Sequence, residues 1–412
     1  MHLDRSSTPA CRTPKWWTIS LLIVVTVMIS ACDWTLPHQP LTRAEFASVD
    51  FRSIVPERFW GDEAPPNLEE AVKKSVDTLR RRFPEAVNAT PETAPLNAML
   101  VISSGGANGA FGAGVIAGWS ETGNRPQFEI VTGVSTGAMI APFAFLGADY
   151  DQTLIEIYTS VSREKIFQLE MFSGSLFGSS LADTAPLKTL IDKYVTADFV
   201  QAIGEQTRLQ RHLFIVTTHF DAMRPVVWDI GAIALNRGKA GVPLIRQIIL
   251  ASASIPILFP PVAIEWQSEG KSFTELHVDG GVSGQVFAYP SQIRAGRLNE
   301  LLGLTFRRRI YLIQNGNAQL PYDPAQTGMF NIARRSIQGM LVNKENAEIE
   351  RIYYLTKRDG VEFLMIEIPS EFNADQSIDF DRNNMRALLE VGLRVGRNPN
   401  SWHALPPGLR GD

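Results

Sequence analysis

The 412-residue chain is expected to fold as an α/β protein with a largely parallel sheet and helices on both faces. Apolar stretches such as residues 98–102 and 128–134 have the length and composition of strands, and each runs into a glycine-rich turn. Each turn opens an apolar helical stretch, and strands and helices go on alternating along the chain. This alternation is typical of a parallel sheet with helices on both faces. A residue in such a turn lies at the carboxyl end of its strand, where open α/β sheets bind their ligands.

Composition limits the class of function. With 45% hydrophobic and 20% charged residues, the chain can build one large domain or two modest ones. The net charge of -4 indicates no basic face, so nucleic acid is not an expected partner. Both cysteines, Cys11 and Cys32, precede the folded body, so its stability must come from the burial of apolar side chains.

Residues 1–31 have the features of a bacterial lipoprotein signal peptide. Basic residues precede an apolar run, 16–29, that is short for a membrane span, which needs roughly 17–25 residues. The run ends in Ile29-Ser30-Ala31-Cys32, which resembles a lipobox and implies a lipidated Cys32 at the mature N-terminus. We therefore expect a chain anchored on the periplasmic face of the cell envelope, and Asp33 favours the inner membrane. An ordinary signal peptide and an uncleaved anchor remain alternatives.

Residues 32–95 are predicted to form a tether and an N-terminal helical extension. Eight prolines interrupt this span, as expected of a tether or an extended wrap. In residues 67–83, apolar residues recur at helical spacing behind Asn67, which can cap a helix. The basic residues of this helix could contact anionic lipid headgroups, but a helix packed on the core with a solvated basic face is the more ordinary interpretation.

The stretch from residue 101 to 137 contains a candidate site in two halves. In the second half, strand 128–134 runs into Gly133-Val134-Ser135-Thr136-Gly137 and on into an apolar helix. A serine in this strand–turn–helix context is typical of a nucleophile elbow. Gly133 and Gly137 stand where bulky side chains would clash. Ser135 is therefore the candidate nucleophile of an acyl hydrolase, and a serine at an ordinary turn is the plain alternative.

The first half supplies candidate oxyanion donors. Gly105, Gly106 and Ala107 lack bulk and lie where a helix begins, so their backbone N–H groups can approach a ligand closely. Acyl transfer needs such donors, aimed at the oxygen that becomes negatively charged.

A rival motif, Gly112-x-Gly114-x-x-x-Gly118, looks like a dinucleotide fingerprint. Its glycines fall inside the expected helix rather than in the turn, and no G-K-[ST] loop occurs. Nucleotide is therefore not an expected ligand, and we expect these glycines to allow close helix–sheet packing.

The base that activates Ser135 has several candidates. The histidines are His2, His38, His212, His219, His277 and His403. None lies in a recognisable turn beside other polar groups, although a late histidine such as His403 suits an α/β-hydrolase triad. In contrast, a short strand delivers Asp279 into the turn Gly280-Gly281, where little obstructs its carboxylate. Burial without a salt bridge would raise the pKa of Asp279 and strengthen it as a base.

In this order, the motifs resemble the patatin-like phospholipase family. Besides the glycine turn, G-x-S-x-G and D-G-G, residues 251–256 (ASASIP) are similar to the family's A-S-x-A-x-P segment, and residues 183–187 (DTAPL) to its D-x-x-P-L element. The resemblance covers about residues 96–315. It implies a three-layer fold and a Ser135–Asp279 dyad that needs no histidine, metal or other cofactor.

One position departs from the family's G-G-G-x-[RK]-G pattern. Ser104 replaces the first glycine and Asn108 the basic residue, while Gly109 is retained. Because the oxyanion donors are backbone groups, we expect the oxyanion hole to survive. The lost positive charge leaves the substrate preference open.

The predicted organisation is a signal peptide over 1–31, the extension over 32–95, a catalytic domain over 96–400 and a tail over 401–412. The expected function is lipid acyl hydrolysis of the phospholipase A type, in which ester bonds of membrane lipids are cleaved through an acyl-enzyme at Ser135. An acyltransferase and a membrane-tethered binding protein without activity remain alternatives. The sequence determines neither the headgroup, the acyl position nor the oligomeric state.

Overall fold

The computed structural model describes residues 38–65, 67–160, 168–169, 182–268, 270–320, 322, 324, 327–372 and 380–410. The signal peptide, Cys32 and Asp33 lie outside these residues. So does most of the apolar segment 166–181, which the sequence suggests as a rim for acyl chains or as a core-packing loop. In the described part of the chain, no helix combines the length and hydropathy of a membrane span.

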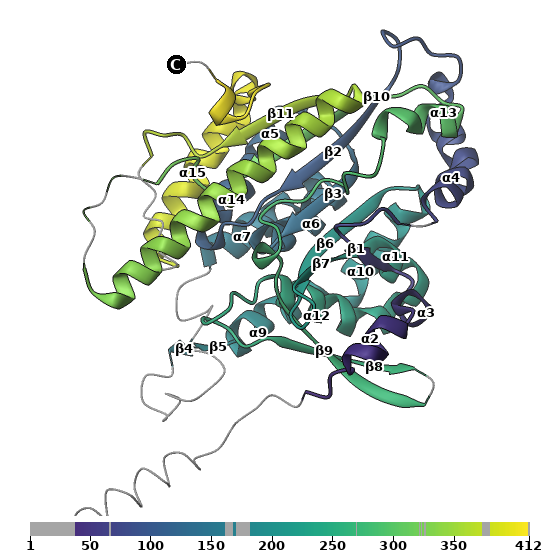
Figure 1. Cartoon of the computed structure of the whole chain (residues 1–412). Helices are drawn as coiled ribbons and strands as arrows, with labels where there is room; N and C mark the ends of the chain where they lie inside the picture. Colours follow the sequence, from purple (N-terminus) through teal and green to yellow (C-terminus); the bar gives the residue numbers. More distant parts are fainter. Residues whose placement is uncertain are drawn as a thin grey trace, which may run out of the picture.

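Within the described residues, a nine-stranded sheet forms the centre of the molecule (Figure 1). The strand order is β1-β7-β6-β3-β2-β10-β11, and β9 pairs with β6 and with β8. The five strands from β6 to β11 in this order are parallel, while β1, β7, β8 and β9 join antiparallel. The strands are β1 (Arg58–Trp60), β2 (Leu96–Ile102), β3 (Phe128–Val134), β6 (His212–His219), β7 (Arg224–Asp229), β8 (Val262–Ser268), β9 (Lys271–Asp279), β10 (Arg307–Gln314) and β11 (Glu362–Glu367), and β4 (Gln168–Leu169) pairs with β5 (Ala182–Asp183) apart from them.

Helices cover both faces of the sheet. Along β2, Leu100 and Ile102 enter the larger hydrophobic cluster, and Met99 and Val101 enter a second cluster on the opposite face. This alternation follows from the period of two in a strand. The larger cluster holds α5 (Gly109–Glu121), α6 (Thr136–Leu146), α7 (Asp151–Ser160), α9 (Ala185–Tyr194), α10 (Ala197–Arg208), α11 (Ile230–Arg237), α12 (Val242–Ser252) and α15 (Arg382–Arg397), and the second cluster holds α14 (Met329–Asp359). The predicted α/β fold with a mostly parallel, helix-flanked sheet is confirmed.

Helix α14 is a single helix of 31 residues. It runs without a break from Met329 to a left-handed cap at Gly360. Leucine, methionine, glutamate and lysine, which are strong helix formers, outweigh the single Gly339 in its interior.

Helices α5 and α15 are in backbone contact, which differs from the helix–sheet packing expected of the α5 glycines. A Cβ atom on Gly114 would meet the carbonyl oxygen of Leu389, and one on Gly392 would meet that of Phe111. Gly118 and Gly396 repeat the contact one turn on. Residues four apart share a helix face, so each helix faces the other with two glycines that have no side chain.

The N-terminal extension is part of the folded domain rather than only a tether. Strand β1 pairs with β7 at the edge of the sheet, and the short helices α2 (Arg43–Ser48) and α3 (Phe51–Ile54) precede it. Helix α4 (Leu68–Arg82) packs through Leu79 against a small cluster that includes Phe306. Asn67 precedes α4 as expected but makes no side-chain capping hydrogen bond.

The C-terminal tail is also packed. His403 and Met365 of β11 exchange two backbone hydrogen bonds of 2.8 Å. The ring of Trp402 lies 4.7 Å from that of Trp119 in α5, measured between centroids. Residues beyond 400 therefore continue the sheet edge and cover a helix end.

Candidate active site

Strand β6 brings Ser135 and Asp279 together. Strand β3 runs parallel to β6 and ends with Val134 beside Val216. Strand β9 approaches the same edge of β6 from the other direction and ends with Asp279 beside Thr217. The two strand ends therefore meet at consecutive residues of β6. The Ser135 hydroxyl donates a hydrogen bond of 2.6 Å to Oδ2 of Asp279 across this junction.

Ser135 lies in a strained turn, as a nucleophile elbow requires. Its backbone has φ 55° and ψ -121°, a region sparsely populated by residues other than glycine. Its N–H donates to Oγ of Ser252, 3.0 Å away, and that hydroxyl in turn donates to the carbonyl of Val216. Ser252, the first serine of the ASASIP segment, therefore links the elbow to β6.

The glycines on either side of Ser135 have no room for a side chain. A Cβ atom on Gly133 would meet the carbonyl oxygen of Gly137, and one on Gly137 would lie 2.5 Å from that of Ile102. Both contacts involve backbone, which cannot move aside without moving helix α6 or strand β2. The steric reason for the G-x-S-x-G motif is thus present at both positions.

Asp279 is buried and held from two sides. Its Oδ1 accepts a 2.7 Å hydrogen bond from the N–H of Gly281, and its own N–H donates to the carbonyl of Ser254. Burial raises the pKa of Asp279 to about 7, against the opposing effect of the hydrogen bonds from Ser135 and Gly281. A Cβ atom on Gly280 would meet the carbonyl oxygen of Val216. The D-G-G turn therefore fits tightly against β6.

The glycine turn after β2 abuts the elbow. A side chain at Gly109 would occupy the place of the Thr136 hydroxyl, next to Ser135. Gly106 has φ +55°, which favours glycine, and opens a single 3-10 turn before α5. Among the hydrogen bonds described for this turn, none is donated by the amide groups of residues 105–107. These three N–H groups are therefore the candidates for oxyanion donors.

The sequence did not identify two residues that brace this turn. Asn315, directly after β10, donates from Nδ2 to the carbonyl of Ser103 (2.9 Å) and accepts from the N–H of Gly112 (3.1 Å). A Cβ atom on Gly105 would lie 2.6 Å from that of Asn315. The sequence signal for Asn315 is its position just after the apolar run 310–313, since the carboxyl ends of parallel strands meet at one edge of a sheet.

Gln285 links the two halves of the site. Its carbonyl accepts from the N–H of Ser104 (2.8 Å), its side chain contacts the Ser104 hydroxyl, and its Nε2 donates to the carbonyl of Gly281 (2.9 Å). One side chain therefore fixes the glycine turn after β2 relative to the loop of Asp279. Nothing in the local sequence pattern marks it.

Asn108, which replaces the family's basic residue, is only 7% exposed at the start of α5. The basic residue that Asn108 replaces would therefore stand at a largely buried position and not on the open surface.

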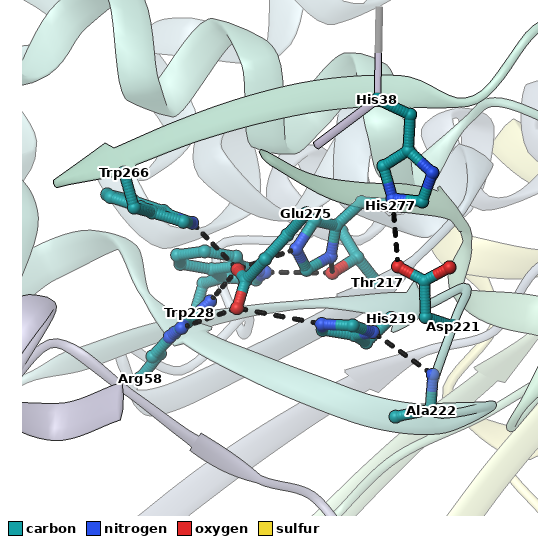
Figure 2. Close-up of polar contacts among 10 residues, drawn as sticks. All are labelled: His38, Arg58, Thr217, His219, Asp221, Ala222, Trp228, Trp266, Glu275 and His277. Atoms are coloured by element: carbon teal, nitrogen blue, oxygen red, sulfur yellow. Dashed lines mark hydrogen bonds and ion pairs between the residues drawn. The ribbon is translucent and has the colours of Figure 1, made fainter. Parts of the chain in front are cut away.

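Figure 2 shows a second buried polar cluster around Glu275, also on β9. Arg58 donates to both of its carboxylate oxygens, over 2.5 and 3.0 Å, and Nε1 of Trp266 donates over 2.7 Å. Nε2 of His277 and of His219 lie 3.3 and 3.6 Å from the carboxylate. Burial would raise the pKa of Glu275, but Arg58 and these donors hold it well below its usual range.

The histidines of the described chain are engaged away from Ser135. Burial lowers the pKa of His277 to about 4, and its Nδ1 bonds to the Thr217 hydroxyl. His219 accepts from the N–H of Ala222, and His38 pairs with Asp221 (Figure 2). His212 faces Asp229, and His403 belongs to the β11 bridge. Also within the described residues, no group of His, Cys, Asp and Glu side chains is arranged to hold a metal ion.

Residues 100–290 match the family model described as patatin-like phospholipase. This part of the chain is therefore similar to patatin-like phospholipases. The matched range contains Ser135, Asp279 and the glycine turn, and this family is one of lipid acyl hydrolases. A search of curated proteins gave no match.

Among solved structures, this chain is similar to VipD from Legionella pneumophila, with 11% sequence identity and a TM-score of 0.34. The alignment covers 72% of this chain and 66% of VipD, slightly under two thirds of its length. This likeness is too low to inform the function.

Proposed function

We propose that this protein is a serine lipid acyl hydrolase of the phospholipase A type, with Ser135 as nucleophile and Asp279 as general base. The observation that carries the proposal is the 2.6 Å hydrogen bond from the Ser135 hydroxyl to a buried carboxylate. Because burial raises the pKa of that carboxylate to about 7, it is a far better match to a serine proton than an exposed aspartate would be. The family match supports an ester of a lipid as the substrate.

In the proposed reaction, Oγ of Ser135 bonds to the ester carbonyl carbon while its proton passes to Asp279. The carbonyl oxygen becomes negatively charged, and the free amides of residues 105–107 are the donors that would stabilise it. The carbon–oxygen bond to the glycerol side then breaks, and Asp279 returns its proton to the departing oxygen. Water next attacks the acyl-enzyme, gives a proton to Asp279 and releases the fatty acid as Ser135 takes the proton back.

Labelling by a fluorophosphonate probe tests the nucleophile. We expect the full chain to be labelled and the Ser135→Ala variant not to be labelled. Lipid profiling of membranes exposed to each protein should show free fatty acid and lysolipid with the wild type only. Equal labelling of the two proteins would rule out Ser135, and transfer of the acyl group to an added alcohol, without free fatty acid, would indicate an acyltransferase.

We further propose that the enzyme is a lipoprotein of the cell envelope, anchored by acyl chains on Cys32. The support is the sequence Ile29-Ser30-Ala31-Cys32 behind a basic and apolar leader. Each buried CH₂ adds about 0.8 kcal/mol of membrane affinity, so several chains hold firmly where one does not. Metabolic labelling with an alkyne palmitate should mark the wild type and not Cys32→Ala. Labelling of both proteins would contradict the anchor.

A further inference from the structure

The first half of α14 exposes a row of large apolar side chains. None of the side chains described between residues 329 and 341 is buried, whereas Glu345 and Ile349 further along are. Figure 1 shows this end of the helix extending past the neighbouring elements. Met329 is 89% exposed and Met340 71%. The others in the row are Ile332, Ile337 and Leu341.

These side chains form one stripe. Met329, Ile332, Ala333, Ile337, Met340 and Leu341 are spaced by three or four residues, so they share one side of the helix. Gln338 lies about 160° around the helix from Met340. Its Oε1 accepts a 3.5 Å hydrogen bond from Arg334. From residue 327 to 344 the sequence has three basic residues and no acidic one, in a chain whose net charge is -4.

The stripe continues onto the candidate active site. One turn past Met340, Nζ of Lys344 donates to the carbonyl of Val282, 2.7 Å away, and Oε2 of Glu348 accepts from the N–H of Gln285, also at 2.7 Å. Both contacts hold the loop that follows Asp279. Ile337, Leu341, Lys344 and Glu348 are successive positions of one ridge along the helix. The exposed apolar row is therefore continuous along α14 with the residues that hold the loop of Asp279.

A second exposed apolar residue lies in another loop at Asp279. The carbonyl of Ser254 accepts from the N–H of Asp279, and three residues later Ile257 is 66% exposed. Its φ of +75° is strained for a β-branched residue. Two elements that contact the Asp279 region, α14 and the loop of Ser254, thus each expose apolar side chains to solvent.

We propose that the α14 stripe is the surface by which the enzyme docks on an anionic phospholipid bilayer and presents Ser135 to lipid. The proposal rests on the proposed function, since the occupant of the surface is also the substrate. An amphipathic helix with basic residues and few acidic ones lies in the headgroup region, with its apolar face toward the acyl chains. The positive charge of this segment favours a bilayer that contains anionic lipid.

The test uses the full chain reconstituted in vesicles of phosphatidylcholine and phosphatidylglycerol, in which phosphatidylglycerol supplies the negative surface charge. Met340→Glu places a charge in the stripe, and Gln338→Glu places the same charge on the opposite side of the same turn. Two rates are measured in each preparation, one for a water-soluble short-chain ester and one for the bilayer phospholipid. Hydrogen–deuterium exchange of peptides from residues 329–343 gives a readout independent of catalysis.

We expect Met340→Glu to lower the bilayer rate about tenfold and to speed hydrogen–deuterium exchange in residues 329–343. The variant lacks the methionine side chain that the membrane would bury. The short-chain ester rate should stay within about twofold, and Gln338→Glu should leave both rates near the wild type. Unchanged bilayer hydrolysis and exchange in Met340→Glu would overturn the docking surface. Slow exchange that appears only at high protein-to-lipid ratio would assign the stripe to a second copy of the chain instead.

Failure of the proposed function is distinguishable. A wild type that cleaves neither substrate would disprove the hydrolase, and the exchange comparison would still decide whether the stripe contacts lipid.

Discussion

Strand β9 carries two buried carboxylates in opposite situations. Glu275 and Asp279 are four residues apart, so their side chains leave the same face of the strand, and they are only 2% and 5% exposed. Arg58, Trp266 and two histidines surround Glu275 with donors, and its pKa is held well below the usual range. Asp279 receives hydrogen bonds from Ser135 and Gly281, and burial raises its pKa to about 7.

The comparison shows that burial alone does not set the charge of a carboxyl group. Both groups lose water, which favours the neutral form. A guanidinium paired with Glu275 more than compensates for this loss, whereas the two hydrogen bonds to Asp279 compensate only in part. The same strand therefore supplies a permanent ion that fastens β1 to the domain and, one residue before the glycine turn, a group able to exchange a proton near neutral pH.

The largest expected effect comes from removing the proposed base. Asp279→Asn keeps the shape but cannot accept the proton from Ser135, so ester hydrolysis should fall about 10³- to 10⁴-fold. Glu275→Gln on the same strand should retain activity per folded molecule within a few-fold, as should His403→Ala. Initial rates with a short-chain ester, together with circular dichroism to confirm folding, check all three. Loss of activity in His403→Ala and not in Asp279→Asn would replace the dyad by a triad.

Removing the cation should affect stability rather than chemistry. Arg58→Met leaves Glu275 buried without its partner, and we expect the free energy of unfolding to fall by about 3–5 kcal/mol. The matched control is Arg224→Met, whose ion pairs with Asp62 and Glu63 are far more exposed, so the expected change is under about 1 kcal/mol. Chemical denaturation measures both. Similar losses in the two variants would show that the Glu275 cluster has no special role.

The two carboxylates should respond to pH with opposite signs. The raised pKa of Asp279 means that the folded state keeps a proton that the unfolded state releases between about pH 4 and 7. Its contribution to stability is thus complete at low pH and is lost as pH rises through about 7. The lowered pKa of Glu275 gives a contribution that is present above its ordinary pKa and is lost as pH falls.

Denaturation of the wild type and of Asp279→Asn from pH 4 to 8 isolates the first contribution. The free energy of unfolding of the variant should rise relative to that of the wild type as pH rises. The expected change is on the order of 4 kcal/mol over the whole range, since one pKa unit corresponds to about 1.4 kcal/mol. A difference in stability that is independent of pH would mean that Asp279 is ionised throughout.

The smallest expected effect is that of Glu275→Gln on the pH profile of activity. Because the base must be deprotonated to act, kcat/KM should rise about tenfold per pH unit below 7 and level off above it. Glu275→Gln should leave this midpoint nearly unchanged, because burial, Ser135 and Gly281, and not Glu275, set the pKa of Asp279. A midpoint near 4 in the wild type would contradict the raised pKa of Asp279.

Much of the site followed from local patterns. Ser135 and Asp279 each close a strand and enter glycines, and the contacts of Gly133, Gly137 and Gly280 show the steric reason for those glycines. The helix formed by residues 109–121 was also predictable, but its Gly114 and Gly118 face α15 and not the sheet. The partner of a helix face depends on which distant segment folds onto it, and α15 is more than 260 residues further along the chain.

Residues that act through long-range contacts were beyond the local sequence. Gln285 and Asn315 have no motif, and they matter because β2, β10 and the Asp279 loop converge. The sequence did not predict that residues 43–60 belong to the folded domain, for the same reason. Prolines indicated a tether, whereas the partner of Arg58 is 217 residues away at Glu275.

The sequence by itself determined the α/β fold class, the nucleophile elbow, the aspartate in its glycine turn and the likeness to patatin-like phospholipases, because each is written in a few adjacent residues. Only the tertiary structure decided that the ends of β3 and β9 meet at Val216 and Thr217 of β6, which puts the serine and the aspartate in contact. It also decided which carboxylate of β9 is paired with a cation. Desolvation and ion pairing depend on everything that surrounds a group, and that environment comes from residues far apart in the chain.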